Sequence, residues 1–154
     1  MPLIDLVKPE TVIPSLHGAN KKQILQELSE EAAAVSGFDA REIRDALVQR
    51  ERLGSTGIGA GIAIPHGKLA SCQRIFGMFA RLERPVDFEA LDDAPVDLVF
   101  LLIAPESAGA DHLNALSRVA RAFRDQSLVA TLRSTRDASA LYSVLVRSPT
   151  PNAA

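Results

Sequence analysis

Apolar residues recur at helical spacing soon after the start of the chain. Asn20, followed three residues later by Gln23, is typical of a helix N-terminal cap, and Gly37 is the kind of residue that ends a helix. The pattern between them predicts a helix over 21–35. The apolar positions that define this helix are Ile24, Leu25, Leu28, Ala32 and Val35.

A second helical pattern follows, and its apolar face contains a cation. Asp39 begins another capping pattern, which predicts a helix over about 40–53. The next position on the apolar face of this helix is Arg50 instead of an aliphatic residue. On the residues alone, Arg50 either extends to the surface, pairs with Asp45 or Glu51, or belongs to a site. The apolar residues of this face are Ile43, Ala46 and Leu47.

Extended segments occupy the middle of the chain. Residues 74–81 and 95–104 are predicted strands, and the second is so continuously apolar that it belongs at the centre of a sheet covered on both faces. Between them, 85–88 suggests a short strand and 91–94 a turn. Near the start of the chain, 11–16 predicts an edge strand, because the prolines there cannot donate to a central ladder.

Helical patterns return in the last third. The apolar face of 111–124 predicts a helix, and 128–133 and 137–146 predict two shorter ones that cover the sheet. The segment 147–154 has little to bury, so we expect a flexible tail. This order of elements indicates an α/β sandwich around one mixed sheet, with helices on both faces, and not a regular βαβ repeat.

Composition fits one globular domain over 1–154, with its core at about 5–146. The 154 residues are 47% hydrophobic with a net charge of -2, which suits a buried core and argues against nucleic acid. No apolar run approaches the roughly 20 residues of a membrane span, and no export signal is evident, so we expect a cytoplasmic protein without membrane insertion. Cys72 is expected to be a small filler residue, and the aspartates within 87–93 to be solvated, which leaves no metal or cofactor.

The most unusual run of residues lies between the second helix and the central strands. Four glycines from Gly54 to Gly61 predict an exposed loop, and the apolar residues 62–64 predict a short strand. Pro65 cannot donate to a ladder, so this strand is expected to end at His66. An imidazole between proline and glycine is open to a large anionic group, as a nucleophile would need to be.

Two nucleotide-binding motifs are imitated by this run but fail on context. Gly57, Gly59 and Gly61 have the spacing of a dinucleotide fingerprint, which requires a strand before it and a helix after it, whereas the order here is reversed. The stretch from Gly61 to Lys68 imitates a P-loop, but five residues separate its glycines instead of four, and Leu69 replaces the hydroxyl that binds magnesium. The sequence therefore contains neither nucleotide-binding motif.

The residues around this loop resemble a known family. Residues 50–59, Arg-Glu-Arg-Leu-Gly-Ser-Thr-Gly-Ile-Gly, and 62–68, Ile-Ala-Ile-Pro-His-Gly-Lys, are similar to the IIA domain of the sugar phosphotransferase system, mannitol/fructose type, and within it to the nitrogen-regulatory branch. The resemblance covers about 5–146 and implies the same α/β sandwich. It also implies phosphoryl transfer, in which a neutral histidine attacks the phosphohistidine of an HPr-like carrier in a nearly in-line geometry.

The resemblance assigns roles to individual residues. It implies that Nε2 of His66 accepts the phosphoryl group, and that Arg50 approaches His66 and can donate two hydrogen bonds to phosphoryl oxygens. It also implies that His112, at the start of its helix, faces His66 as a neutral donor. The candidates for a phosphoryl-binding loop are Ser55, Thr56 and Gly67.

The other histidine positions have simpler interpretations. Taken alone, His112 would be a helix-start residue bonded to water or to a carboxylate, although the helix dipole in that turn favours both anions and neutral imidazole. His17 has no companion and is expected to be a solvated loop residue. The nitrogen branch often carries a further histidine where this chain has Asn114, so that residue's auxiliary role is not carried over.

Two functions share His66. The favoured one is a nitrogen- and potassium-linked regulatory phosphocarrier, whose partners by resemblance are an HPr-like carrier and targets such as potassium transporters or sensor kinases. The alternative is a sugar-specific IIA component that passes the phosphoryl group to a separate IIB. A histidine-based hydrolase would need a serine elbow or a metal triad, and the sequence offers neither.

Overall fold

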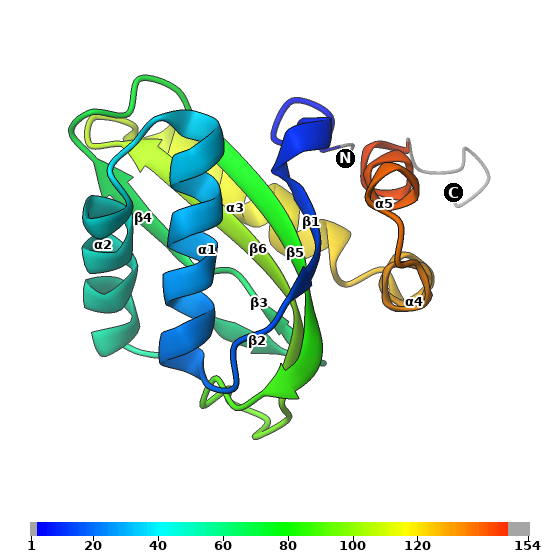
Figure 1. Cartoon of the computed structure of the whole chain (residues 1–154). Coiled ribbons are helices and arrows are strands. Elements are labelled where there is room, and N and C mark those ends of the chain that lie inside the picture. Colours follow the sequence, from blue (N-terminus) through cyan, green and yellow to red (C-terminus); the bar gives the residue numbers. More distant parts are fainter. Residues whose placement is uncertain (1–2, 148–154) are drawn as a thin grey trace.

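A mixed β-sheet runs through the centre of the molecule, with helices on both sides (Figure 1). The computed structural model describes residues 3–147. Within them the sheet has six strands in the order β1-β5-β6-β3-β2, and β4 pairs with β6 further along the edge that β3 uses. The strands are β1 (Val12–Leu16), β2 (Gly57–Gly59), β3 (Ile62–Ala63), β4 (His66–Leu69), β5 (Phe76–Val86) and β6 (Val96–Pro105). The helices are the 3-10 helix η1 (Pro9–Thr11), α1 (Lys21–Ser36), α2 (Ala40–Arg52), α3 (Gly109–Ala122), α4 (Gln126–Ser134) and α5 (Ala138–Val146).

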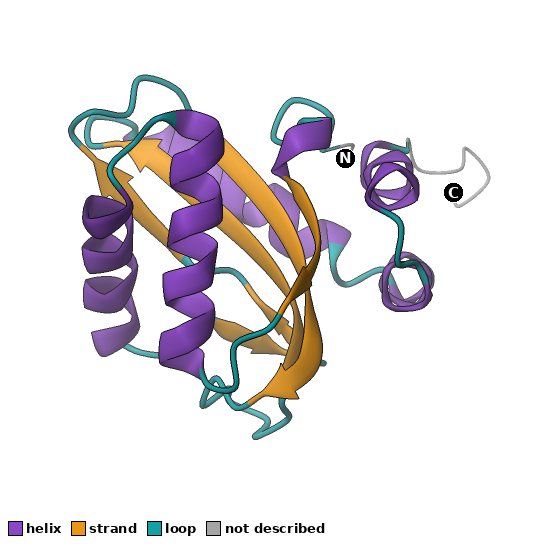
Figure 2. Ribbon diagram, viewed as in Figure 1, coloured by secondary structure: helices purple, strands orange, loops and turns teal. Residues whose placement is uncertain are grey.

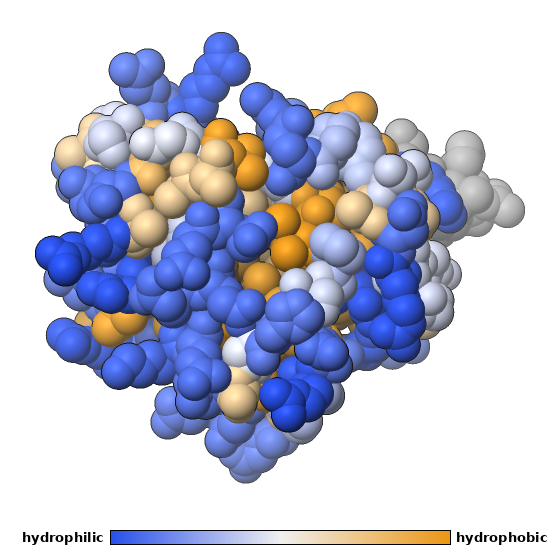
Figure 3. Space-filling model, in the orientation of Figure 1, coloured by the Kyte–Doolittle hydropathy of each residue, from blue (hydrophilic) through white to orange (hydrophobic). Residues whose placement is uncertain are grey.

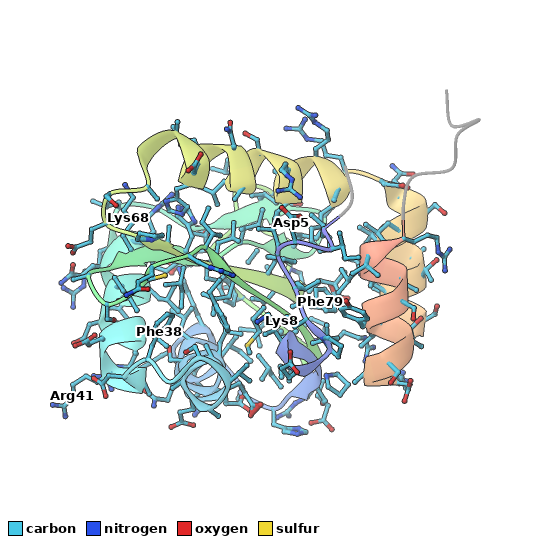
Figure 4. All side chains as sticks on the ribbon, turned by 90° about the horizontal axis from the view of Figure 1, so that it is seen from above. Asp5, Lys8, Phe38, Arg41, Lys68 and Phe79 are labelled. Atoms are coloured by element: carbon cyan, nitrogen blue, oxygen red, sulfur yellow. The ribbon has the colours of Figure 1, made fainter. Side chains whose placement is uncertain are left out.

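Each face of the sheet carries its own hydrophobic core. Helices α1 and α2 cover one face, and α3, α4 and α5 cover the other (Figure 2). The central strand β6 supplies both cores, because its side chains alternate: Val99 and Leu101 pack under α1 and α2, whereas Phe100 and Leu102 pack on the opposite side. Figure 4 shows these layers from above, with Phe79 in the core beside α5. The predicted α/β sandwich around a mixed sheet is confirmed.

The outer sides of the helices are mainly polar, as expected for amphipathic helices that cover a sheet. In Figure 3, hydrophilic side chains cover the exposed sides of α1 and α2, and hydrophobic ones reach the surface in the strip between α1 and β1. The strand β1 lies at the sheet edge, as predicted for a segment with prolines. Its neighbour β5 separates it from the central β6.

The predicted caps of the first two helices are confirmed. The Asn20 side chain accepts a hydrogen bond from the backbone N–H of Gln23 at 2.9 Å, and Gly37 ends α1 in the left-handed conformation with φ of 81°. Asp39 caps α2 by accepting from the N–H of Glu42 at 3.3 Å. These signals are local in sequence, which is why they could be identified without tertiary information.

The later helices exist where they were predicted, with shifted bounds. Helix α3 begins at Gly109, two residues earlier than expected. Helix α4 has an N-cap that the sequence analysis did not identify, since Asp125 accepts from the N–H groups of Ser127 and Leu128 at 2.9 and 3.2 Å. The expected flexible tail at 147–154 lies outside the described residues from position 148 onward.

The prediction that a strand ends at His66 is wrong. Strand β3 ends at Ala63, and a separate strand, β4, begins at His66 and pairs in parallel with β6 opposite Leu102. Pro65 interrupts the ladder because it has no N–H, but its carbonyl still accepts from the N–H of Leu102 at 3.0 Å. This hydrogen bond continues the pairing with β6 directly after the proline, so His66 is the first residue of a new strand.

Two other predictions about extended segments need correction. The glycine-rich stretch is not only a loop: Gly57–Gly59 forms β2, which pairs antiparallel with β3 across a turn where Gly61 has φ of 82°. Residues 85–88 do not form a separate short strand, because β5 continues as far as Val86 after a shift in its register with β6. Both features depend on strand pairing, of β2 with β3 and of Val86 with Val96.

Candidate active site

The ring of His66 is oriented by a backbone carbonyl. Its Nδ1 lies 2.8 Å from the carbonyl oxygen of Ile64, two residues earlier in the chain. A carbonyl oxygen only accepts hydrogen bonds, so Nδ1 must carry the proton of this contact. The half-buried imidazole is therefore held by its own connection between β3 and β4.

Arg50 contacts the other nitrogen of the same ring. Its Nε donates to Nε2 of His66 at 3.2 Å, and its Nη1 donates to the carbonyl oxygen of Gly54 at 2.9 Å. A guanidinium has donors only, so Nε2 must present its lone pair. Two independent contacts thus select one neutral tautomer of His66, with the proton on Nδ1 and a nucleophilic lone pair on Nε2.

The two carboxylates that could have paired with Arg50 form ion pairs with other cations. Asp45 forms an ion pair with Arg44 at 3.2 Å, and Glu51 forms one with Lys21 at 2.8 Å. The cation on the apolar face of α2 is thereby free to contact His66. The structure brings Arg50 to the histidine, as the resemblance implied.

Gly67 allows the helix that carries Arg50 to lie close to β4. A Cβ atom at this position would stand 3.0 Å from the Cβ of Ala46 in α2, which is tighter than ordinary van der Waals contact. Ala46 is itself on the inward face of the helix. The observed part of Gly67 in the site is therefore close packing, and its contact with a phosphoryl group stays a prediction.

His112 joins the site from the opposite layer. It lies in the first turn of α3, is 6% exposed, and its ring centroid stands 5.5 Å from that of His66 with 72° between the ring planes. Its Nε2 is buried and lacks a hydrogen-bond partner within the described part of the chain. A buried polar atom without a partner is costly, which makes this nitrogen available to a group that enters the site.

Burial and nearby positive charge lower the pKa of both imidazoles. Burial lowers the pKa of His66 below its ordinary value of 6.5, the hydrogen bond to Ile64 opposes this shift, and the charge of Arg50 adds to it. Burial also lowers the pKa of His112, with smaller contributions from His66 and Lys68. Lys68 extends from β4 near the start of α3 (Figure 4) and was not identified from the sequence as a neighbour of the site.

These lowered pKa values predict a loss of stability in acid. The unfolded chain takes up protons on its histidines near pH 6.5, whereas folded His66 and His112 take them up only at lower pH. The free energy of unfolding is therefore expected to fall as pH decreases from about 7 toward about 5. Urea denaturation of wild type and His112→Gln across this range checks the sign: the variant should lose less stability on acidification, and equal losses would contradict the assignment.

The hydroxyl groups of the predicted phosphoryl-binding loop are engaged within the protein. Ser55 donates to the carbonyl oxygen of Phe88 at 2.5 Å and accepts from the N–H of Gly57 at 3.0 Å. The hydroxyl and the N–H of Thr56 both donate to the carboxylate of Glu51. Both residues hold the loop in place, and phosphoryl binding by their side chains stays a prediction.

Two further polar residues, Asn114 and Asp92, have other surroundings than the site around His66. Asn114 lines a surface hollow together with Arg74 and Arg121, which His112 does not line. Asp92 accepts from the N–H groups of Ala60 and Ala94 at 2.9 and 3.1 Å. Between residues 3 and 147, no group of three histidine, cysteine or acidic residues could hold a metal ion. The same residues contain no helix that is long and apolar enough to cross a membrane.

This fold, together with paired histidines and an arginine, belongs to a known class. Residues 5–148 match the family described as "Phosphoenolpyruvate-dependent sugar phosphotransferase system, EIIA 2". The chain belongs to this family. The crystal structure of "IIA mannitol from Escherichia coli" has the same fold, with a TM-score of 0.76 at 22% identity over 90% of this chain and 98% of that one.

Within the family, the chain is similar to proteins of the nitrogen-regulatory branch. It is 57% identical to the "Nitrogen regulatory protein" of Bradyrhizobium diazoefficiens over 149 residues, which is 97% of each chain. The structure of "Nitrogen Regulatory Protein IIA-Ntr from Neisseria meningitidis" matches with a TM-score of 0.85 at 33% identity, over 92% of this chain and 97% of that one. The resemblance drawn from the sequence is confirmed, and these relatives support a regulatory role within the PTS IIA family.

Proposed function

We propose that the protein is a cytoplasmic phosphohistidine carrier, which accepts a phosphoryl group on Nε2 of His66 from an HPr-like protein and uses its phosphorylation state to regulate other proteins. The observation that carries this proposal is the fixed tautomer of His66. The carbonyl oxygen of Ile64 accepts a hydrogen bond from Nδ1–H, and Arg50 donates one to Nε2. The lone pair needed for attack is thus present before the carrier arrives.

The transfer requires one bond to form and one to break. Nε2 of His66 bonds to phosphorus while the bond from phosphorus to the carrier's imidazole nitrogen breaks, and the electron pair of that bond stays on the carrier. Arg50 leaves Nε2 as the attack begins, and its planar group of N–H donors turns to the equatorial oxygens. Positioning and charge neutralisation are the protein's main contributions, because the phosphoryl group itself needs little further chemistry.

His112 would stabilise the transferred group from the other side. Its buried Nε2 has no partner within the described residues, and its ring stands 5.5 Å from that of His66. In the neutral tautomer with a proton on Nε2, it can donate to a phosphoryl oxygen. This role differs from that of an acceptor, since a nitrogen that donates its proton has no lone pair for attack.

Substitution of His112 separates donation from a structural role. His112→Gln keeps a neutral N–H donor, whereas His112→Ala loses it, so the alanine variant is expected to be slower by about two- to twelvefold, the equivalent of one neutral hydrogen bond. Single-turnover transfer rates measure the difference. Both variants should still be phosphorylated on His66; loss of phosphorylation in both, with the fold intact, would make His112 a relay or an acceptor.

The output of the phosphorylated form distinguishes the two functions that share the site. We favour regulation, with targets such as potassium transporters or sensor kinases, because the relatives at 57% and 41% identity are named nitrogen regulatory proteins. Sugar transport is the alternative, because a "PTS system fructose-specific EIIA component" of Haloferax volcanii is 34% identical over 80% of this chain. One structural neighbour is described in complex with phosphorylated IIB of the mannitol system.

The test begins with the phosphoryl relay. The protein is incubated with phosphoenolpyruvate, enzyme I and an HPr-like carrier, and its mass is measured at neutral pH because phosphohistidine is acid-labile. One added phosphoryl group is expected. A fructose-type IIB is then added: a phosphoryl group that stays on the protein supports regulation, whereas rapid transfer to IIB supports sugar transport.

Partner capture then addresses the regulatory output. His66→Ala removes the acceptor, and His66→Asp places a negative charge near the site, so the two variants should differ in the proteins they retain if phosphorylation controls docking. The recovered proteins are identified by mass spectrometry. Identical recovery by wild type and both variants would contradict control through His66.

A further inference from the structure

One buried carboxylate beside the site has no part in the transfer described so far. Glu51 directly follows Arg50 in α2, and its side chain is 6% exposed. It accepts from Nζ of Lys21 at 2.8 Å, from the N–H of Thr56 at 3.1 Å, and from the Thr56 hydroxyl. A buried charge is costly unless it is paired and hydrogen-bonded, and here both conditions are met.

A chain of hydrogen bonds leads from this carboxylate to His66. Thr56, held by Glu51, accepts at its carbonyl oxygen from the N–H of Ile64 at 3.0 Å. The carbonyl oxygen of the same Ile64 accepts from Nδ1 of His66 at 2.8 Å. The contact that selects the tautomer of His66 is therefore anchored, through Thr56 and Ile64, on Glu51.

The same loop also supports Arg50. Gly54, two residues before Thr56, accepts from Nη1 of Arg50 at 2.9 Å, and the N–H of Gly54 donates to the carbonyl oxygen of Glu51 at 3.1 Å. The loop is thus bonded to the end of α2 at both Gly54 and Thr56. A shift of the loop would move both groups that contact the ring of His66.

We propose that Glu51 is a positioning residue for the transfer assigned to His66: by fixing Thr56 it holds the carbonyl of Ile64 against Nδ1, and so keeps Nε2 as the free nucleophilic nitrogen. This inference rests on the proposed function only for its effect on the transfer rate. Its effect on the ring of His66 holds in the unphosphorylated protein, whatever the protein does.

The donor set explains why this position takes a carboxylate. Three donors converge on Glu51, from two groups of Thr56 and from Lys21. An ionised carboxylate has only acceptor sites, whereas the amide of a glutamine would turn an NH₂ group toward one of these donors. Glu51→Gln therefore keeps the side-chain volume but removes the charge that strengthens all three contacts, and its NH₂ group can meet the Thr56 hydroxyl only if that hydroxyl turns to accept.

Glu51→Gln removes both a negative charge and a positioning contact, and these two losses have opposite effects on the transfer rate. The rate therefore distinguishes between them. The charged groups that face His66 are Arg50 and Glu51 from α2, with His112 from α3 and Lys68 acting on His112. The negative charge of Glu51 raises the pKa of His66, so its removal leaves more of the ring neutral. On charge alone, Glu51→Gln would transfer faster near pH 6.5, whereas lost positioning makes it slower at every pH.

The experiment measures the tautomer first and the rate second. Nitrogen-15 NMR of the unphosphorylated protein gives the tautomer and titration of His66 in wild type, Glu51→Gln and Thr56→Val, and in the control Glu89→Gln. Glu89 is the second carboxylate near Lys21, at 3.7 Å, and its side chain is 79% exposed. Thr56→Val removes only the hydroxyl contact, so it keeps the test decisive if Glu51→Gln does not fold.

We expect Glu51→Gln to raise the ratio of the Nε2-protonated to the Nδ1-protonated tautomer of His66 about tenfold. Single-turnover transfer at pH 8 should be slower than in wild type, because the nucleophilic tautomer is less populated and the loop that also contacts Arg50 is no longer held. Thr56→Val should move both in the same direction by less, and Glu89→Gln should match wild type. An unchanged tautomer in folded Glu51→Gln, or transfer that is equal or faster at pH 8, would overturn the inference. Absence of transfer in wild type would refute the proposed function instead, because the tautomer comparison does not depend on it.

Discussion

A His66→Ala variant is expected to accept no measurable phosphoryl group from the HPr-like carrier, which corresponds to a loss of about a thousandfold or more in rate. The chain has three histidines, and only the ring of His66 is held with one nitrogen protonated by contact and the other accepting from a cation. His112 is 6% exposed. Mass spectrometry at neutral pH after incubation with the phosphoryl relay measures the result.

His17 provides the matched control. It lies at the surface, where its Nδ1 contacts Glu83 at 2.5 Å, and this carboxylate raises its pKa. His17→Ala should therefore be phosphorylated as fully as wild type. If His66→Ala gained a phosphoryl group with unchanged stoichiometry, the acceptor would have to be another side chain.

Arg50→Lys is expected to slow the transfer by about 30- to 150-fold although it keeps the charge, because one strong charge-assisted interaction in the transition state is worth about 2–3 kcal/mol. In the structure Arg50 uses two different nitrogens, Nε on His66 and Nη1 on Gly54. A single ammonium group cannot make both contacts and cannot supply the planar pair of donors to a phosphoryl group. Single-turnover rates at saturating carrier measure the effect.

Arg52→Lys is the control for this prediction. Arg52 is in the same last turn of α2 and is exposed, so its replacement tests for a general effect of the substitution on the helix end. It should transfer at the wild-type rate. If Arg50→Lys were as fast as Arg52→Lys, with both proteins folded, Arg50 would be a structural residue and not part of the transfer.

The parts of the fold that could be predicted were those encoded locally. The caps at Asn20 and Asp39 satisfy N–H groups three residues away, so sequence spacing alone identifies them. The continuous apolar run that became β6 required burial on both faces wherever it lay. The approach of Arg50 to His66 was implied by the family resemblance and not by spacing, since the residues alone favour an Arg50 that extends to the surface or pairs with Asp45 or Glu51.

The parts that could not be predicted depend on partners far away in the chain. Whether the strand stops or restarts at His66 is decided by Leu102, which bonds to Pro65 and pairs with His66. The hydroxyl of Ser55 is directed by the carbonyl of Phe88, 33 residues later. The sequence indicates Glu51 only as a possible partner for Arg50, because nothing in it shows that α1 and the glycine loop converge on this carboxylate.

NMR of the phosphorylated protein tests most directly whether Nε2 of His66 receives the phosphoryl group. Two- and three-bond correlations between ring protons and nitrogen-15 show which nitrogen carries phosphorus. The observed contacts predict phosphorus on Nε2 of His66, with Nδ1 protonated and still bonded to Ile64. Phosphorus on Nδ1 of His66, or on any other side chain, would contradict the account.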